Sequence, residues 1–132
     1  MLTGGCYCGA VRYETDGEPF HETICHCADC RRIVGAASVA WFTVPRATLR
    51  FTRQEPASVR SSPAVMRRFC GACGTSLTYA NDGAPDEIDV TTASLDDAEA
   101  WPPKDHTRVR GKLRWEAVCD GLPAFEGVRP KG

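Results

Sequence analysis

The chain has 132 residues and a formal net charge of −1, with 42% hydrophobic and 25% charged residues. This balance is typical of one globular domain, which we expect to cover residues 1–132. It lacks the excess of positive charge that favours binding to nucleic acid or to an anionic membrane surface.

The N-terminal sequence, MLTGGC, contains neither the basic nor the apolar region of a secretory signal. The longest nearly apolar run, residues 33–44, is shorter than the roughly 20 residues that a membrane-spanning helix needs. We therefore expect a cytoplasmic protein. Because structural disulfides are rare in a reducing cytosol, the eight cysteines are expected to bind metal or to act as reactive thiols.

Short runs that alternate apolar and polar residues predict β-strands, since successive side chains in a strand point to opposite faces. In chain order the predicted strands cover residues 10–14, 38–44, 48–52, 64–69, 76–79 and 87–92. The sequence NDG at 81–83 predicts a turn between the last two strands. Ser94, with Asp97 three residues later, predicts a short helix or helical turn that ends near residues 101–103. The sequence therefore predicts a mainly β fold of short strands with little helix.

Four cysteines form two closely spaced pairs, Cys6-x-Cys8 and Cys70-x-x-Cys73. In an extended strand residues i and i+2 point to the same side, so Cys6 and Cys8 can contact one ion. The glycines beside Cys70 and Cys73 permit a tight turn that directs backbone N–H groups toward sulfur. Together the four thiolates would complete the tetrahedral coordination of a structural zinc. The alternative is that all four are small buried residues without a metal.

The central cysteines, Cys25, Cys27 and Cys30, form a set of three. Three thiolates could bind a second zinc and leave its fourth position open to water or substrate, as catalytic zinc sites do. His26 lies between two of these cysteines, but in an extended segment its side chain would point away from them.

Two other interpretations of this set stay open. A residue distant in sequence could occupy the fourth position and make the site structural. The candidates for this ligand are Cys119, His21 and His106. Alternatively, Cys27 and Cys30 could form a redox pair that cycles between dithiol and disulfide. The adjacent Arg31 and Arg32 would stabilise thiolates in each case.

Six segments follow one another along the chain: GGCYCGAVRYE, CHCADCRRIVGA, RRFCGACGTSLTY, DVTTASLDD, DHTRVRGKLRW and DGLPAFEG. Their order and spacing resemble the glutathione-dependent formaldehyde-activating enzyme family, which includes the centromere protein V domain. The resemblance implies an Mss4-like β fold of antiparallel strands stapled by zinc, with two zinc ions per chain. Carried over by position, the structural zinc would be bound by Cys6, Cys8, Cys70 and Cys73, and the second zinc by Cys25, Cys27 and Cys30.

The activity for which this family is named joins glutathione and formaldehyde to give S-(hydroxymethyl)glutathione. The resemblance therefore implies a zinc-dependent carbon–sulfur lyase or synthase whose partners are a small-molecule thiol and a small aldehyde, and neither nucleic acid nor a membrane. The carboxylates of glutathione could be bound by Arg31, Arg32, Arg67 or Arg68 through forked hydrogen bonds. The alternative is a non-catalytic zinc-binding module that recruits a protein partner. The coordination of the second metal would separate these two functions.

Overall fold

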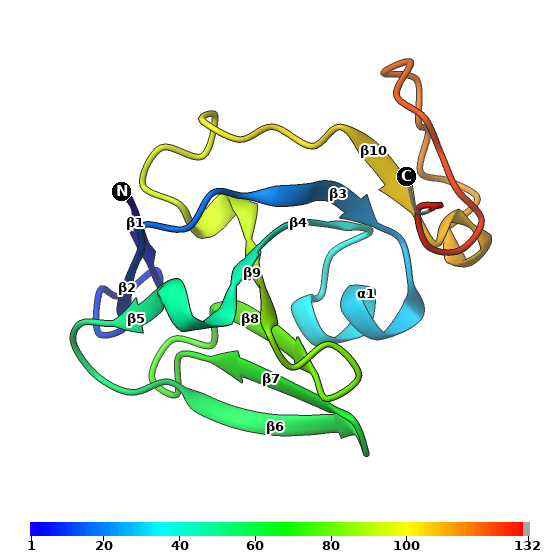
Figure 1. Cartoon of the computed structure of the whole chain (residues 1–132). Coiled ribbons are helices and arrows are strands. Elements are labelled where there is room, and N and C mark those ends of the chain that lie inside the picture. Colours follow the sequence, from blue (N-terminus) through cyan, green and yellow to red (C-terminus); the bar gives the residue numbers. More distant parts are fainter. Residues whose placement is uncertain (131–132) are drawn as a thin grey trace.

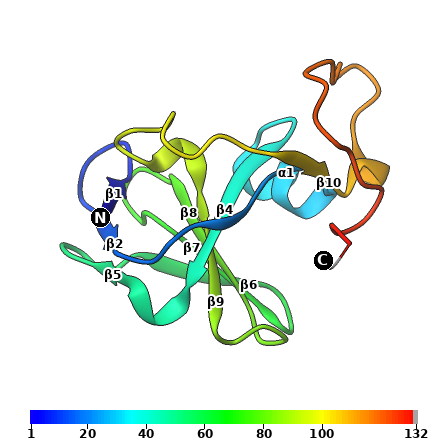
Figure 2. The ribbon, with the colours of Figure 1, turned by 45° about the horizontal axis from the view of Figure 1, so that its top comes forward.

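The computed structural model describes residues 1–130, and these form two β-sheets with a single α-helix beside them. The small sheet has the order β1-β2-β5, and its strands are β1 (Leu2–Gly5), β2 (Arg12–Thr15) and β5 (Leu49–Phe51). Figures 1 and 2 place this sheet at one end of the molecule, with β10 and the C-terminal segment at the other.

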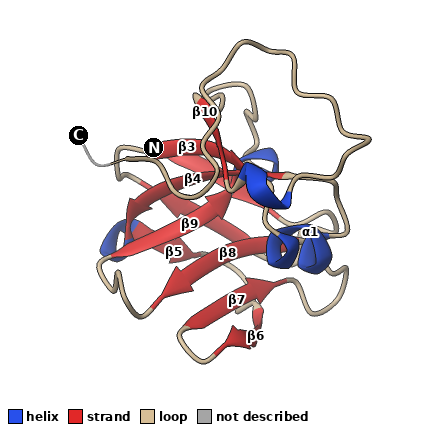
Figure 3. Cartoon of the chain, turned by 90° about the vertical axis from the view of Figure 1, so that its right-hand side faces the viewer, coloured by secondary structure: helices blue, strands red, loops and turns tan. Residues whose placement is uncertain are grey.

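The large sheet has the order β10-β3-β4-β9-β8-β7-β6, which can be followed from top to bottom in Figure 3. Its strands are β3 (Phe20–Cys25), β4 (Val39–Pro45), β6 (Ala57–Ser62), β7 (Val65–Phe69), β8 (Ser76–Asn81), β9 (Glu87–Thr91) and β10 (Asp105–Thr107). All neighbouring strands are antiparallel except β10, which pairs in parallel with β3. The helices are α1 (Ala28–Val34) and the 3-10 helices η1 (Arg46–Thr48), η2 (Thr92–Ser94) and η3 (Val109–Gly111).

The mainly β fold predicted from the sequence is confirmed, and each predicted strand overlaps an observed one. The prediction missed β1, β3, β6, β10 and α1. The alternation in β3 is interrupted at His21, which adopts a positive φ of 51° where the register with β4 shifts. The helix α1 has seven residues, too few to display a helical periodicity. The prediction of one domain over residues 1–132 extends two residues beyond the described part and stays a prediction.

Of the short helix or helical turn predicted after Ser94, the helix is wrong and only turns are found. The 3-10 helix η2 ends at Ser94, and Leu95 returns to an extended conformation and bridges to Gly4. The Ser94 hydroxyl does not cap a following helix, because it donates to the carbonyl of Thr91 and bonds the hydroxyl of Tyr13. Hydrogen-bonded turns follow over residues 96–99. Tertiary contact with the small sheet has therefore overridden the local capping signal.

The central strand β4 is buried on both faces, and each face contributes to a different cluster. Phe42 and Val44 belong to the main hydrophobic core, together with Leu77 and Val90. Trp41, on the opposite face of β4, belongs to a second cluster, which it forms with Val39, Cys25 and Cys30. One face of the large sheet thus provides most of the packing, while the other is available for a site.

No helix among the described residues is both long enough and apolar enough to cross a membrane. This finding agrees with the short apolar run seen in the sequence.

Gly4 is expected to be essential for the contact between the small sheet and the 3-10 helix η2. Its backbone is so close to the Tyr13 hydroxyl and the Ser94 carbonyl that a Cβ atom there would overlap both. We predict that Gly4→Ala lowers the free energy of unfolding by about 1–3 kcal/mol, the usual cost of overpacking. Gly127→Ala is the control, because no atom lies within 4 Å of its added Cβ. Urea unfolding with equal midpoints for both variants would contradict the prediction.

Candidate functional site

The first cysteine cluster joins the two sheets. Cys6 and Cys8 follow β1 of the small sheet, and Cys70 and Cys73 follow β7 of the large sheet. Their four sulfur atoms lie within 4.8 Å of one another, an arrangement that could hold a metal ion. The sulfur of Cys8 is 3.6 Å from that of Cys6 and 3.7 Å from that of Cys70.

The backbone around this cluster presents N–H groups to the sulfur atoms. The Val11 amide donates to Cys6 Sγ at 3.2 Å, and the Ala72 and Cys73 amides donate to Cys70 Sγ at 3.4 Å. Hydrogen bonds from Thr75, first through its hydroxyl, lower the pKa of Cys73 to about 5. These donors stabilise thiolates, the form in which cysteine binds a metal.

The extended conformation expected for Cys6 and Cys8 is not observed. The strand β1 ends at Gly5, and Cys6 begins a turn that closes through a hydrogen bond from the Gly9 amide to its carbonyl. Gly9 has a φ of 81°, a value that favours glycine. Both pairs of cysteines therefore lie on turns, and the two sulfur atoms of Cys6 and Cys8 converge because the chain folds back.

The second cluster lies where β3 passes into α1. Cys25 is the last residue of β3, Cys27 is the N-cap of α1, and Cys30 lies in the first turn of this helix. Their sulfur atoms also lie within 4.8 Å of one another and could hold a metal ion. Cys27 Sγ accepts the Cys30 amide at 3.2 Å. Contacts with the sulfur atoms of Cys25 and then Cys30 lower the pKa of Cys27 to about 2, so the cluster favours a thiolate at this position.

Within residues 1–130 this second cluster contains three ligands and no fourth. Cys119 is exposed. Cys119, His21 and His106 all lie outside the cluster. The side chain of His26 points away from its two cysteine neighbours, as expected, and is buried against His106. All eight cysteines of the chain are free thiols in the structure.

The two buried histidines, His26 and His106, contact each other and residues of the C-terminal segment. His106 Nδ1 lies 2.9 Å from His26 Nε2, and His106 Nε2 lies 2.8 Å from an oxygen of Asp120. Hydrogen bonds from the Leu122 amide and then from His106 lower the pKa of Asp120. The Asp120 carboxylate is therefore the acceptor, and the Nε2–H group of His106 is the donor. This network assigns the Nδ1 atom of His106 as the acceptor of the His26 N–H. Neither ring is available to complete the second cluster.

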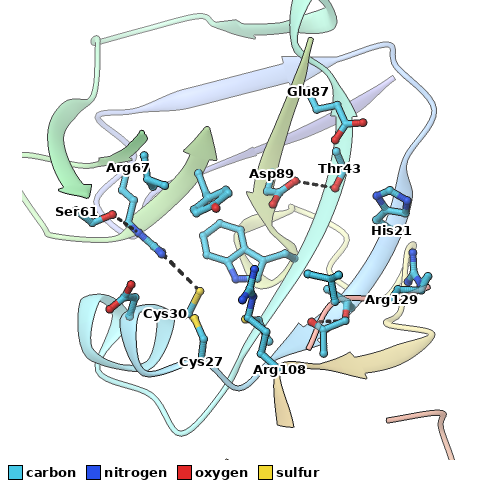
Figure 4. A pocket seen from close by; sticks show the side chains of 18 of the residues that line it. His21, Cys27, Cys30, Thr43, Ser61, Arg67, Glu87, Asp89, Arg108 and Arg129 are labelled. Atoms are coloured by element: carbon cyan, nitrogen blue, oxygen red, sulfur yellow. Dashed lines mark hydrogen bonds between the residues drawn. The ribbon is translucent and has the colours of Figure 1, made fainter. Parts of the chain in front are cut away.

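The second cluster opens onto a cavity of about 780 Å³. Figure 4 shows the sulfur atoms of Cys27 and Cys30 at one end of this cleft and Glu87 at the other. The walls between them include Trp41 of β4 and Tyr79 of β8, whose ring centroids are 6.2 Å apart. Along β4 the cleft residues Trp41 and Thr43 alternate with the core residues Phe42 and Val44, so this strand both lines the cleft and supports the main core.

Of the four arginines expected to bind carboxylates, Arg67 lines this cleft and the other three do not. Arg31 and Arg32 lie on α1, and Arg68 points to the opposite side of β7, over the ring of Phe51. The sequence prediction missed two further arginines on the cleft wall, Arg108 and Arg129. Only their placement in space could have identified them, because no local motif marks them as ligands.

A carboxyl group with an altered pKa lies on the cleft wall away from the sulfur atoms. Asp89 Oδ1 accepts a hydrogen bond of 2.7 Å from the hydroxyl of Thr43 on the neighbouring strand. Burial raises the pKa of Asp89 to about 6, and the negative charge of Glu87 acts in the same direction. The charge of the cleft therefore changes in the pH range just below neutrality.

Comparison with known proteins agrees with this geometry. A crystal structure of a Rhodobacter sphaeroides protein, a structural genomics target, superposes with a TM-score of 0.62 at 23% identity, covering 93% of this chain and 98% of that one. A Halomonas elongata protein that is named for the glutathione-dependent formaldehyde-activating enzymes is 26% identical over 128 residues, which cover 89% of this chain and 81% of the relative. The sequence model of that family matches residues 1–111, a stretch that contains both cysteine clusters. The chain therefore belongs to the glutathione-dependent formaldehyde-activating enzyme family.

Proposed function

We propose that the protein is a zinc-dependent carbon–sulfur lyase of the S-(hydroxymethyl)glutathione synthase type. It would add a thiol, glutathione, to formaldehyde or a related small aldehyde, or reverse this addition. The proposal assigns a structural zinc to Cys6, Cys8, Cys70 and Cys73 and a second zinc with an open position to Cys25, Cys27 and Cys30. It also places the protein in a reducing compartment, the cytoplasm, where these cysteines would not be oxidised to disulfides.

The observation that carries this proposal is the position of the three-sulfur cluster at one end of the cleft. Three thiols that lie within 4.8 Å of one another suit a soft metal ion, and the described residues provide no fourth ligand. The adjoining cavity of about 780 Å³ is within the range that small-molecule sites occupy. A binding module whose metals serve only the fold would not need an open cluster beside a cavity of this size.

The reaction would form one bond between the thiol sulfur and the carbonyl carbon, and the proton of the thiol would end on the carbonyl oxygen. No oxidant or reductant is needed. Zinc bound by the three cysteines would supply a coordination position that favours the deprotonated form of the thiol.

The protein's side chains would bind and orient the two substrates. Trp41 and Tyr79 give the cleft an apolar wall that limits the access of water to the sulfur atoms. Arg108 is exposed on the cleft wall and could bind a carboxylate of glutathione. Arg129 is less available for this role, because it already pairs with Asp105.

The two clusters are predicted to differ in their contribution to stability. Cys70 is buried in the main core, so Cys70→Ser should remove the first zinc and lower the melting temperature by about 10 °C or more, since metal binding there is part of the folding free energy. Cys27 lies at the cleft, and Cys27→Ser should leave a folded protein with one zinc. Elemental analysis together with thermal melts would check both variants. An equal loss of stability in Cys70→Ser and Cys27→Ser would contradict the predicted difference between the two clusters.

Binding of a thiol at the second cluster tests the function itself. In protein loaded with cobalt, glutathione should strengthen the sulfur-to-cobalt charge-transfer absorption, and formaldehyde added next should weaken it as the adduct forms. Cys27→Ser protein, which has lost this metal, is the control. A spectrum that does not respond to glutathione would refute the proposed function. Binding of glutathione without faster formation of the adduct would show that the aldehyde is not the substrate.

Asp89 is predicted to make stability depend on pH. Its pKa of about 6 in the folded protein exceeds the ordinary value of 3.8, so the folded state binds the proton more tightly and stability falls as the pH rises from about 4 to about 6. Asp89→Asn should abolish this fall and be more stable than the wild type at pH 7.5, by up to about 2 kcal/mol, and not at pH 4.

The control for this prediction is Asp86→Asn, which alters an exposed carboxylate in the turn before β9. Urea unfolding at the two pH values, with equal metal content in all three proteins, isolates the contribution of Asp89. An Asp89→Asn variant that shows the same pH dependence as the wild type would refute the assignment.

A further inference from the structure

The guanidinium of Arg67 is a buried positive charge without a carboxylate partner. Arg67 lies on β7 with 5% of its surface exposed, and no carboxylate of the described residues lies within 4.0 Å of its nitrogen atoms. Its Nε atom donates to the Ser61 hydroxyl at 2.9 Å, and the guanidinium lies 4.9 Å from the centre of the Tyr79 ring. A buried charge is costly unless it is paired with a group of opposite charge.

The partner of Arg67 is the sulfur of Cys30. Both terminal nitrogens of the guanidinium donate to Cys30 Sγ, at 3.6 and 3.7 Å (Figure 4). Cys30 is itself 5% exposed, so this contact is largely shielded from water. Forked donation from Arg to an anion is among the stronger hydrogen-bonded contacts in proteins. Arg67 therefore favours a thiolate at Cys30 and touches the cluster from the side that faces the cleft.

We propose that Arg67 is the countercharge that lets the second cluster take an anion as its fourth ligand. This inference rests on the second metal of the proposed function. A divalent ion held by three thiolates leaves one net negative charge, which would repel a further anion. The guanidinium cancels this charge, so an entering thiolate meets a neutral site. The ligand class selected is a small soft anion, in preference to a neutral nitrogen base.

The other charged groups near the cleft do not replace Arg67. Asp29 and Arg108 line the same cavity, but both are exposed, so water and salt screen their charges. Asp89 lies on β9, and its carboxyl contacts Thr43 rather than a cysteine. Arg67 alone among these groups combines burial with direct contact to a cluster sulfur.

Two small probes of different charge, each of which binds through nitrogen, test the inference in cobalt-loaded protein. Azide is the anion, and imidazole is the neutral ligand. Difference spectra report only the cluster that has an open position, and Cys27→Ser protein provides the blank. Arg67→Met should weaken azide binding by about 10- to 100-fold, the loss expected for hydrogen bonds to a charged group. Its affinity for imidazole should stay within about threefold of the wild type.

The neighbouring arginine provides the matched control. Arg68→Met removes the same charge from the next position of β7, where the side chain lies over Phe51 on the opposite face, and it should change neither affinity. Arg67→Lys keeps the charge without the fork and should retain most of the azide affinity. If Arg67→Met fails to hold the second metal, Ser61→Ala is the variant to use in its place. It removes the hydrogen bond that positions the Arg67 guanidinium and should weaken azide binding by about threefold.

Three results would overturn the inference. In the first, Arg67→Met, or Ser61→Ala in its place, binds azide as the wild type does. In the second, azide and imidazole lose affinity by the same factor. In the third, the wild-type spectrum responds to imidazole and not to azide. Glutathione added to the same samples separates the two hypotheses: selectivity for azide without a response to glutathione would remove the proposed function and support the role of Arg67.

Discussion

Thiols gathered within 4.8 Å of one another need positive charge around them once they ionise. Two thiolates about 4 Å apart repel each other by about 4 kcal/mol even at an effective dielectric constant of about 20. The fold answers this repulsion by ending β1, β3 and β7 beside the clusters, where backbone N–H groups are no longer used by the sheets. A divalent metal would supply the remaining charge at each cluster. The strand ends, the turns and the start of α1 thus all lie beside the sulfur atoms of the two clusters.

The two faces of the large sheet separate stability from chemistry. Phe42 and Ile88 pack in the main core, while their neighbours Trp41 and Asp89 line the cleft. Because successive side chains in a strand point to opposite faces, one short strand provides both core residues and residues of the cleft wall. The cost appears on the cleft face, where Asp89 and Arg67 are polar groups in a largely buried position. Each is satisfied by a specific contact, Asp89 by Thr43 and Arg67 by Cys30.

The sequence was sufficient to predict the strands with clear alternation and the division of seven cysteines into four and three, because both depend on residue type and spacing. It did not predict which arginine reaches the second cluster. Arg67 and Arg68 are equivalent as sequence, and only the pairing of β7 decides which face each occupies. The helix predicted after Ser94 failed for a related reason, because the Ser94 hydroxyl is used by Tyr13, which is 81 residues away. Contacts of this kind have no local signature.

The sulfur ligands and the walls of the cleft come from different parts of the chain. The family match ends at residue 111 and includes every cysteine of both clusters, whereas Val128 and Arg129 line the cleft from beyond it. Substitutions in the C-terminal segment could therefore reshape the cleft without altering a metal ligand. This segment is not loosely attached, because Arg129 pairs with Asp105 of β10. Since β10 pairs with β3, and β3 ends in Cys25, the C-terminal wall of the cleft is fixed relative to the sulfur atoms that it faces.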